Sequence, residues 1–158
     1  MAGHFLHILH GKTPLDLHRK VMDVSLILYA EHEFNASTFT ARVCASTMSD
    51  IHSCVVAAIG SLRGPLHGGA NEKAMELIEN WTSKEEAKAK IIGMLGNKEK
   101  IMGFGHAVYS IRDPRNAVIK EYAQELSELA ENDTLYKVAE EVEKVMADEK
   151  KMFANADF

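Results

Sequence analysis

Two histidines lie in loops whose composition suits a chemical site. His67 stands in a glycine-rich loop over residues 63–71, and His106 stands in a second loop over residues 103–109. Glycine permits backbone conformations and close approaches that other residues forbid, at an entropic cost. These two loops hold five of the ten glycines of the chain, Gly64, Gly68, Gly69, Gly103 and Gly105. This concentration of glycine around two histidines predicts a shaped site.

The two histidines have environments that suit carbonyl chemistry. His67 precedes a predicted helix, whose N-terminal dipole favours a neutral imidazole over an imidazolium. A neutral histidine can donate a hydrogen bond to a developing oxyanion. His106 is followed by Arg112 and Arg115, and arginine binds carboxylates bidentately. The loops therefore predict a substrate that carries a carbonyl group and carboxylates.

A phosphate-binding role for the loops is the alternative. Gly103 and Gly105 lack the third glycine of the dinucleotide fingerprint, and no strand is predicted before them. Backbone N–H groups and Lys98 or Lys100 could still contact the phosphates of a coenzyme. Each loop alone also fits a turn that merely holds a capping histidine.

The other six histidines predict no metal site. Three of them recur at every third residue of a predicted helix. Each is therefore offset by about 60° around the helix axis from the one before it. His32 and Glu33 begin a zinc-protease motif, but Ala36 stands where its second histidine belongs. A ligand contact by His32 stays open, because it lies where an apolar helix meets a polar loop. The remaining five, His4, His7, His10, His18 and His52, are interpreted as scaffold.

Helical periodicity runs through almost the whole chain and predicts an all-α fold of seven or eight helices. The predicted helices span residues 3–10, 14–28, 41–48, 50–62, 72–81, 84–93, 114–129 and 135–152. The polar stretch 32–40 breaks the pattern. Apolar and polar residues do not alternate as in a strand for more than a few residues.

Composition and charge exclude several classes of function. The 158 residues are 46% hydrophobic, enough for a core without a disulfide or metal. The net charge of −5 divides into +2 over residues 1–120 and −7 over residues 121–158. We interpret this acidic run as a solvated face of two helices, and it disfavours nucleic-acid binding.

The cysteines and the hydropathy pattern indicate an intracellular protein. Cys44 and Cys54 lie in apolar surroundings without metal-ligand spacing, which favours free buried thiols in a reducing compartment. No apolar run approaches the length of a membrane span, and no signal-peptide pattern opens the chain. We expect a cytoplasmic protein in a bacterium, or one of the mitochondrial matrix in a eukaryote, with no membrane partner.

From end to end the chain resembles the citrate synthase family, and most of all its 2-methylcitrate synthase branch. In this order and spacing the matching motifs are specific. They are residues 3–7 (GHFLH), 31–37 (EHEFNAS), 64–71 (GPLHGGAN), 103–109 (GFGHAVY) and 113–115 (DPR).

The resemblance implies catalytic roles for three residues. Asp157 matches the family's catalytic aspartate and would take the α-proton of an acyl-CoA thioester. His67 would stabilise the resulting enol or enolate at the thioester oxygen. His106 would polarise the ketone of oxaloacetate and protonate the alkoxide as the carbon–carbon bond forms.

The resemblance also implies binding residues. His32 and Arg115 match residues that hold oxaloacetate, and hydrolysis of the thioester would release CoA. No metal or permanently bound cofactor is needed, because the coenzyme A thioester is a co-substrate. The stretch that matches the family's CoA contacts is Lys100, Ile101, Met102, Gly103 and Phe104.

Family members are well over twice this length, so we interpret the chain as an internal fragment of the citrate-synthase-type multihelical fold. Residues 1–68 would be the C-terminal helices of the large domain, and residues 69–158 a truncated small domain. We expect the fragment alone to be inactive and to self-associate. The full-length enzyme is expected to be a homodimer or a higher oligomer.

Three other functions are weighed against propionyl-CoA condensation in propionate catabolism. The preference for propionyl-CoA depends on the branch likeness of residues 32–35 and 108–113, so a citrate synthase using acetyl-CoA is the first alternative. A non-catalytic helical module that binds CoA or a metal is the second. The third, an ATP-citrate lyase module, is disfavoured because no ATP-grasp or phosphohistidine segment is present.

Overall fold

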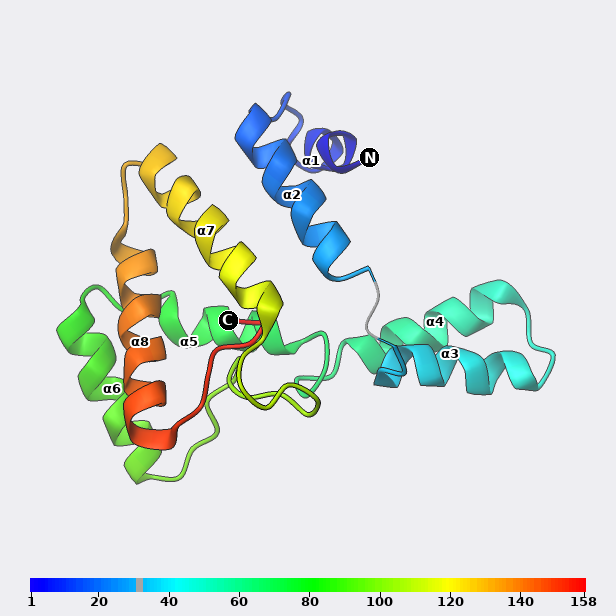
Figure 1. Ribbon diagram of the computed structural model, residues 1–158. Coiled ribbons are helices and arrows are strands. Elements are labelled where there is room, and N and C mark those ends of the chain that lie inside the picture. Colours follow the sequence, from blue (N-terminus) through cyan, green and yellow to red (C-terminus); the bar gives the residue numbers. More distant parts are fainter. Residues whose placement is uncertain (31–32) are drawn as a thin grey trace.

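The computed structural model describes residues 1–30 and 33–158, which fold into eight α-helices joined by loops (Figure 1). The helices are α1 (Ala2–His10), α2 (Asp16–Leu28), α3 (Ala36–Ser46), α4 (Ile51–Leu62), α5 (Ala70–Ile78), α6 (Lys84–Gly96), α7 (Pro114–Leu129) and α8 (Thr134–Lys150). Within the described residues no strand forms, and a single antiparallel bridge pairs Phe104 with Ala154. The expected all-α class is confirmed.

The helices are arranged in three groups. α1 packs on α2, α3 packs on α4, and α6 packs on α8, which also contacts α5 and α7. α7 joins two groups, because it contacts α2 as well as α8. Figure 1 shows the α3–α4 pair extending to one side, while the C-terminal segment returns to the start of α7. None of the helices in the described part is both long and apolar enough to cross a bilayer.

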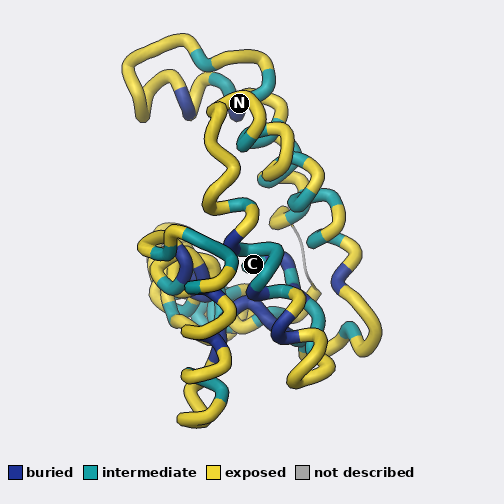
Figure 2. Tube along the Cα trace, turned by 90° about the vertical axis from the view of Figure 1, so that its left-hand side faces the viewer, coloured by how far each residue is buried: buried dark blue, intermediate teal, exposed yellow. Residues whose placement is uncertain are grey.

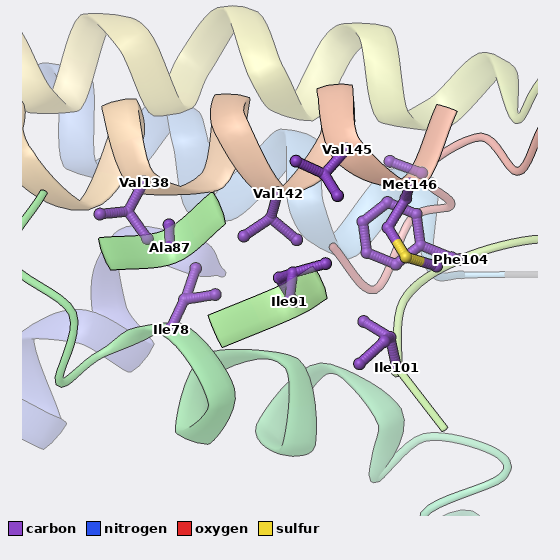
Figure 3. Packing of buried hydrophobic residues seen from close by; sticks show 10 residues of the cluster. Ile78, Ala87, Ile91, Ile101, Phe104, Val138, Val142, Val145 and Met146 are labelled. Carbon is purple, nitrogen blue, oxygen red and sulfur yellow. The ribbon is translucent and has the colours of Figure 1, made fainter. Parts of the chain in front are cut away.

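The apolar core lies between α6 and α8. Val138 and Val142, which are one helical turn apart on α8, are fully buried together with Ala87 and Ile91, four residues apart on α6 (Figure 3). This spacing places each pair on one face of its helix. The cluster is completed by Ile78, Ile101, Phe104, Val145, Met146 and Ala154. Figure 2 shows most buried positions gathered in the part that holds the C-terminus.

Side-chain caps fix where several helices begin. The Ser83 hydroxyl accepts a hydrogen bond from the Glu86 N–H at 3.2 Å, and the Glu86 carboxylate accepts one from the Thr82 N–H at 2.9 Å. These two bonds satisfy backbone donors that a helix start leaves without a partner. Ser83 is therefore the N-cap of α6, which begins at its predicted first residue, and the other side-chain caps are Asn35, Asp50 and Asp113.

The expected break over residues 32–40 was wrong for its second half. α3 begins at Ala36 because the Asn35 side chain accepts the Thr38 N–H at 3.0 Å and caps the first turn. Polar residues at a helix start therefore resemble a loop in the sequence. α5 begins at Ala70, two residues before its predicted start, and α8 ends at Lys150 because Lys151 adopts a positive φ of 56°.

An apolar stripe follows one side of α4. Ile51, Val55 and Ile59 recur every four residues, and all three are exposed. Leu26 and Ile27 of α2 are exposed as well. Such contiguous apolar surface is typical of interaction sites rather than of a monomer's exterior.

We expect this 158-residue chain to self-associate as its concentration rises, because association removes the α4 stripe from water. Sedimentation equilibrium over increasing concentrations measures the apparent mass. The double substitution Val55→Glu and Ile59→Glu is expected to shift the mass toward the monomer, whereas Glu125→Gln on α7 should leave it unchanged. A monomeric mass at every concentration would contradict the expectation.

Candidate active site

The turn that carries His67 is packed tightly against the end of α4. The His67 and Gly69 N–H groups both donate to the Gly64 carbonyl, at 2.9 and 3.1 Å. A Cβ atom on Gly69 would lie 2.5 Å from the Arg63 carbonyl oxygen, which no side chain tolerates. Glycine is therefore required for the turn, and the turn places His67 three residues before the first residue of α5.

Ser37 fixes the proton position of His67. The Ser37 backbone N–H donates to His67 Nε2 at 3.2 Å, and the Ser37 hydroxyl lies 2.9 Å from the same nitrogen. A backbone N–H can only donate, so Nε2 is the acceptor and a neutral ring carries its proton on Nδ1. His67 is thereby prepared to donate a hydrogen bond from Nδ1 to a ligand.

The loop that carries His106 fixes the opposite tautomer. His106 Nδ1 accepts the backbone N–H groups of Val108 and Tyr109, at 3.0 and 3.1 Å. Its ring also lies on the ring of Tyr109, with centroids 4.6 Å apart. With Nδ1 acting as an acceptor, the neutral ring carries its proton on Nε2.

Gly103 allows this loop to approach the C-terminal segment. It has a φ of +85°, and a Cβ atom there would lie 2.6 Å from the Cβ atom of Phe158. The Gly103 carbonyl accepts the Asn155 N–H at 2.9 Å, and the Gly105 N–H donates to the Phe153 carbonyl at 2.8 Å. The histidine loop and residues 153–158 are thus held together by backbone hydrogen bonds.

Asp113 is a buried carboxylate, 2% exposed, that joins three parts of the site. It accepts two hydrogen bonds from the Arg115 guanidinium, at 3.0 and 2.7 Å. It also accepts the Arg115 backbone N–H, which caps α7, and the Ala156 N–H, both at 3.0 Å. Burial by itself raises the pKa of Asp113, but the bonds from Arg115 outweigh burial and hold that pKa below its usual range.

Side-chain amides anchor the segment that carries Asp157. Asn116 on α7 donates to the Asn155 carbonyl at 3.0 Å, and the Asn155 amide donates to the Gly105 carbonyl at 2.8 Å. The Asn155 side-chain oxygen accepts the Asp157 N–H at 2.9 Å. The backbone on either side of Asp157 is therefore fixed to both the histidine loop and α7.

Asp157 itself has the electrostatics of a base. Burial raises its pKa, and the positive charge of Arg115 opposes that effect. The charge of Asp113 also raises this pKa, while His106 and His67 lower it when their rings are protonated. Within the described residues no hydrogen bond reaches the Asp157 carboxylate. A half-buried carboxylate with a raised pKa is a stronger proton acceptor than an exposed one.

The structure thus brings four of the sequence-predicted residues into one electrostatic neighbourhood, His67, His106, Asp157 and Arg115. Two neutral histidines would each present one N–H donor, the carboxylate is the acceptor, and the arginine is a cation suited to carboxylates. This set can remove a proton next to a carbonyl group while two donors stabilise oxygen charge. His32, predicted as a substrate ligand, lies outside the described residues.

The stretch 100–104 is split between the core and the surface. The side chains of Ile101 and Phe104 are buried in the core cluster. Lys100 is exposed and Met102 is partly exposed. A CoA contact here would therefore use backbone groups, Lys100 or Met102, and the binding role of the stretch stays a prediction.

Sequence reasoning missed several supporting residues. Ser37 was quoted within the polar stretch and the 31–37 motif without a role, although its hydroxyl and N–H both meet His67. Asp113 was quoted only as part of the 113–115 motif, although it caps α7 and holds Arg115. Asn116 and Asn155 gave no signal, because their partners lie 39 and 50 residues away.

The comparisons with known proteins agree on one family. The family model described as "Citrate synthase, C-terminal domain" matches residues 1–158. A 2-methylcitrate synthase from Shewanella oneidensis is 64% identical over the whole chain, and a citrate synthase from Deinococcus radiodurans is 44% identical over 99% of it. The chain spans 42% of the length of each of these two relatives.

A solved structure shares the fold closely. It is the citrate synthase from Thermoplasma acidophilum in a ternary complex with carboxymethyl coenzyme A and oxaloacetate, and it superposes with a TM-score of 0.91 at 34% identity. The superposition covers 99% of this chain and 42% of that one. The citrate-synthase-type multihelical fold expected from the sequence is therefore confirmed.

We expect Asp157→Asn to stabilise the fold at neutral pH. The raised pKa of Asp157 means that folding disfavours its ionised form. Above the folded-state pKa, the ionised carboxylate therefore lowers the free energy of unfolding. This loss of stability disappears when the carboxyl group is protonated at low pH. Thermal melting should therefore give a higher Tm for the variant at pH 7 and a smaller difference near pH 3. The matched exposed substitution Asp148→Asn should change Tm little, and equal Tm values for Asp157→Asn and the wild type at pH 7 would count against the assignment.

Proposed function

This chain belongs to the citrate synthase family, and from that membership we propose that it carries most of the catalytic machinery of a 2-methylcitrate synthase. The reaction condenses propionyl-CoA with oxaloacetate and water to give 2-methylcitrate and CoA. Because the chain spans 42% of the relatives' length, the activity is proposed for the complete enzyme that contains it.

The observation that carries this proposal is the surrounding of Asp157. Residues 153–158 are hydrogen-bonded to the His106 loop and to Asp113, which also holds Arg115, and burial raises the pKa of the Asp157 carboxylate among these groups. A base near two histidines whose tautomers are fixed by backbone donors suits a condensation that begins with loss of a proton from carbon.

In the first step, the Asp157 carboxylate takes a proton from C2 of propionyl-CoA. The electron pair of the broken C–H bond moves toward the thioester oxygen, giving an enol or enolate. The Nδ1 proton of His67 supplies the hydrogen bond that this oxygen needs, because Ser37 occupies Nε2.

In the second step, C2 of the enolate attacks the ketone carbon of oxaloacetate. The ketone oxygen gains negative charge and receives a hydrogen bond and then a proton from His106 Nε2, because Nδ1 is held by Val108 and Tyr109. Arg115, held by Asp113, binds a carboxylate of oxaloacetate. Its guanidinium also lies 5.9 Å from the centre of the Tyr109 ring, which keeps it near the histidine loop.

In the last step, water attacks the thioester carbonyl of the condensed product. The C–S bond breaks, one proton of the attacking water goes to the sulfur so that CoA leaves as the thiol, and its oxygen becomes part of the new carboxyl group of 2-methylcitrate. Asp157 then releases the proton that it took from C2, and His106 regains one at Nε2 through solvent, so both groups return to their starting state. No metal takes part in this sequence, and coenzyme A enters and leaves as part of the substrate. The backbone of residues 100–104, together with Lys100, is proposed to contact it.

A citrate synthase that uses acetyl-CoA is the second candidate. It is supported by the relatives named citrate synthase at 40–46% identity, and by one from Bacillus subtilis named citrate/2-methylcitrate synthase at 42%. The 64% identity to a 2-methylcitrate synthase favours propionyl-CoA.

The organisation of the complete enzyme is part of the same proposal. Residues 1–68 would end the large domain and residues 69–158 would begin the small one. In support, every residue of the core cluster lies in the second part. A homodimer would cover the exposed stripe of α4. The relatives from Shewanella oneidensis and Deinococcus radiodurans are bacterial proteins, which supports a cytoplasmic location.

In the complete enzyme, Asp157→Asn is expected to lower kcat by about 100- to 10,000-fold, because the amide cannot accept the proton. His106→Ala should lower kcat by about 100-fold or more, because the ketone oxygen loses its donor. Release of free thiol from propionyl-CoA and oxaloacetate measures the rate. Asp148→Asn, on the exposed side of α8, is the control with normal turnover, and normal turnover by Asp157→Asn would refute the proposed role.

The substrate preference is tested by the ratio of kcat/KM for propionyl-CoA to that for acetyl-CoA. We expect a ratio above 1 for the complete enzyme, measured by the same thiol assay at saturating oxaloacetate. One methylene in an apolar pocket changes such a ratio by about 10- to 200-fold. A ratio well below 1 would favour the citrate synthase alternative.

A further inference from the structure

One hydrogen bond to the base segment comes from far along the chain. Tyr29 caps the C-terminal end of α2, and its hydroxyl donates to the Ala156 carbonyl. Among the recorded hydrogen bonds of the described residues, it alone joins residues 153–158 to residues 1–68. All the other anchors of that segment come from residues 103–158.

This bond acts on the peptide group next to Asp157. The Ala156 carbonyl and the Asp157 N–H belong to one planar peptide unit. Tyr29 holds its oxygen, and the Asn155 side chain holds its N–H at 2.9 Å. The preceding N–H, that of Ala156, is held by the buried Asp113. With both ends of the plane fixed, the N–Cα bond of Asp157 has a fixed direction, and rotation about that bond is the only backbone freedom left to its Cβ atom.

The surroundings of Tyr29 favour a polar role over a packing role. The residue is 46% exposed, so its ring contributes little to a core. Burial of the hydroxyl end raises the pKa of Tyr29 to about 12, and the nearby charge of Asp157 acts in the same direction. The phenol therefore stays protonated and able to donate throughout the neutral pH range.

Resting on the function proposed above, we infer that Tyr29 is a positioning residue for the base. Its hydroxyl fixes the Ala156–Asp157 peptide and thereby limits the directions in which the Asp157 carboxylate can point. The end of α2 and the base are thus coupled, so proton removal is efficient only while α2 and the C-terminal segment keep this contact.

The test is Tyr29→Phe in the complete enzyme, which removes the hydroxyl and keeps the ring. A misdirected base slows proton transfer without weakening substrate binding, so kcat should fall by about 10- to 100-fold while KM for both substrates changes by less than about twofold. The primary isotope effect on kcat with propionyl-CoA deuterated at C2 should rise, because proton removal becomes more rate-limiting. A merely structural residue would not change that isotope effect.

The matched control is Tyr122→Phe on α7. That substitution keeps the aromatic ring beneath the Lys20 ammonium and is expected to leave kcat and the isotope effect unchanged. Hydrogen–deuterium exchange of residues 153–158 should be faster in Tyr29→Phe than in the control or the wild type. Asn155→Ala, which frees the other end of the same peptide plane, should reproduce the raised isotope effect.

Two results would overturn the inference. The first is an unchanged kcat and isotope effect in Tyr29→Phe, whatever Asn155→Ala does. The second is a rise in KM alone in Tyr29→Phe, which would make Tyr29 a contact for substrate. Asp157→Asn in the same assay separates the two proposals, because its normal turnover would defeat the proposed function. Loss of turnover in Asp157→Asn together with normal turnover in Tyr29→Phe would contradict only the positioning role.

Discussion

The site depends on one buried carboxylate. Asp113 starts α7 by accepting the Arg115 N–H, holds the Arg115 guanidinium through two hydrogen bonds, and holds the C-terminal segment through the Ala156 N–H. A buried carboxylate is stable only when its lone pairs are satisfied, and here a guanidinium and two backbone donors satisfy them. Because one side chain makes all these bonds, the Arg115 guanidinium, the start of α7 and residues 153–158 have a common reference point.

Backbone groups set the chemistry of the other functional side chains. One backbone N–H fixes the tautomer of His67, and two fix that of His106, so the two rings present different nitrogens as donors. Backbone geometry is more rigid than side-chain geometry, which explains the glycines of both loops. At Gly69 and Gly103, a side chain would collide with the groups that bring each histidine loop into place.

The helices could be predicted from the sequence because their signals are local. The Ser83 cap and the Pro114 start involve residues three or fewer positions apart, and α6 and α7 begin where they were expected. The start of α3 could not be placed, since Asn35 caps a first turn as polar as a loop. The histidines were visible from their glycines, and Asp157 only from the family resemblance. Asp113 and Tyr29 both hydrogen-bond to Ala156, which lies 43 and 127 residues further along the chain. Contacts at such separations leave no local pattern in the sequence.

The reach of the Tyr29 bond has a consequence for how the molecule acquires its activity. Closing a contact across 127 residues requires a large loss of chain entropy, which the core between α6 and α8 must already have offset. Synthesis runs from the N-terminus, so α2 waits through the translation of all later helices before its partner exists. The helices depend on local contacts, whereas the anchoring of the peptide next to Asp157 depends on a long-range contact that closes slowly. Until that contact closes, a partly folded chain can hold both histidine loops while this peptide lacks one of its anchors.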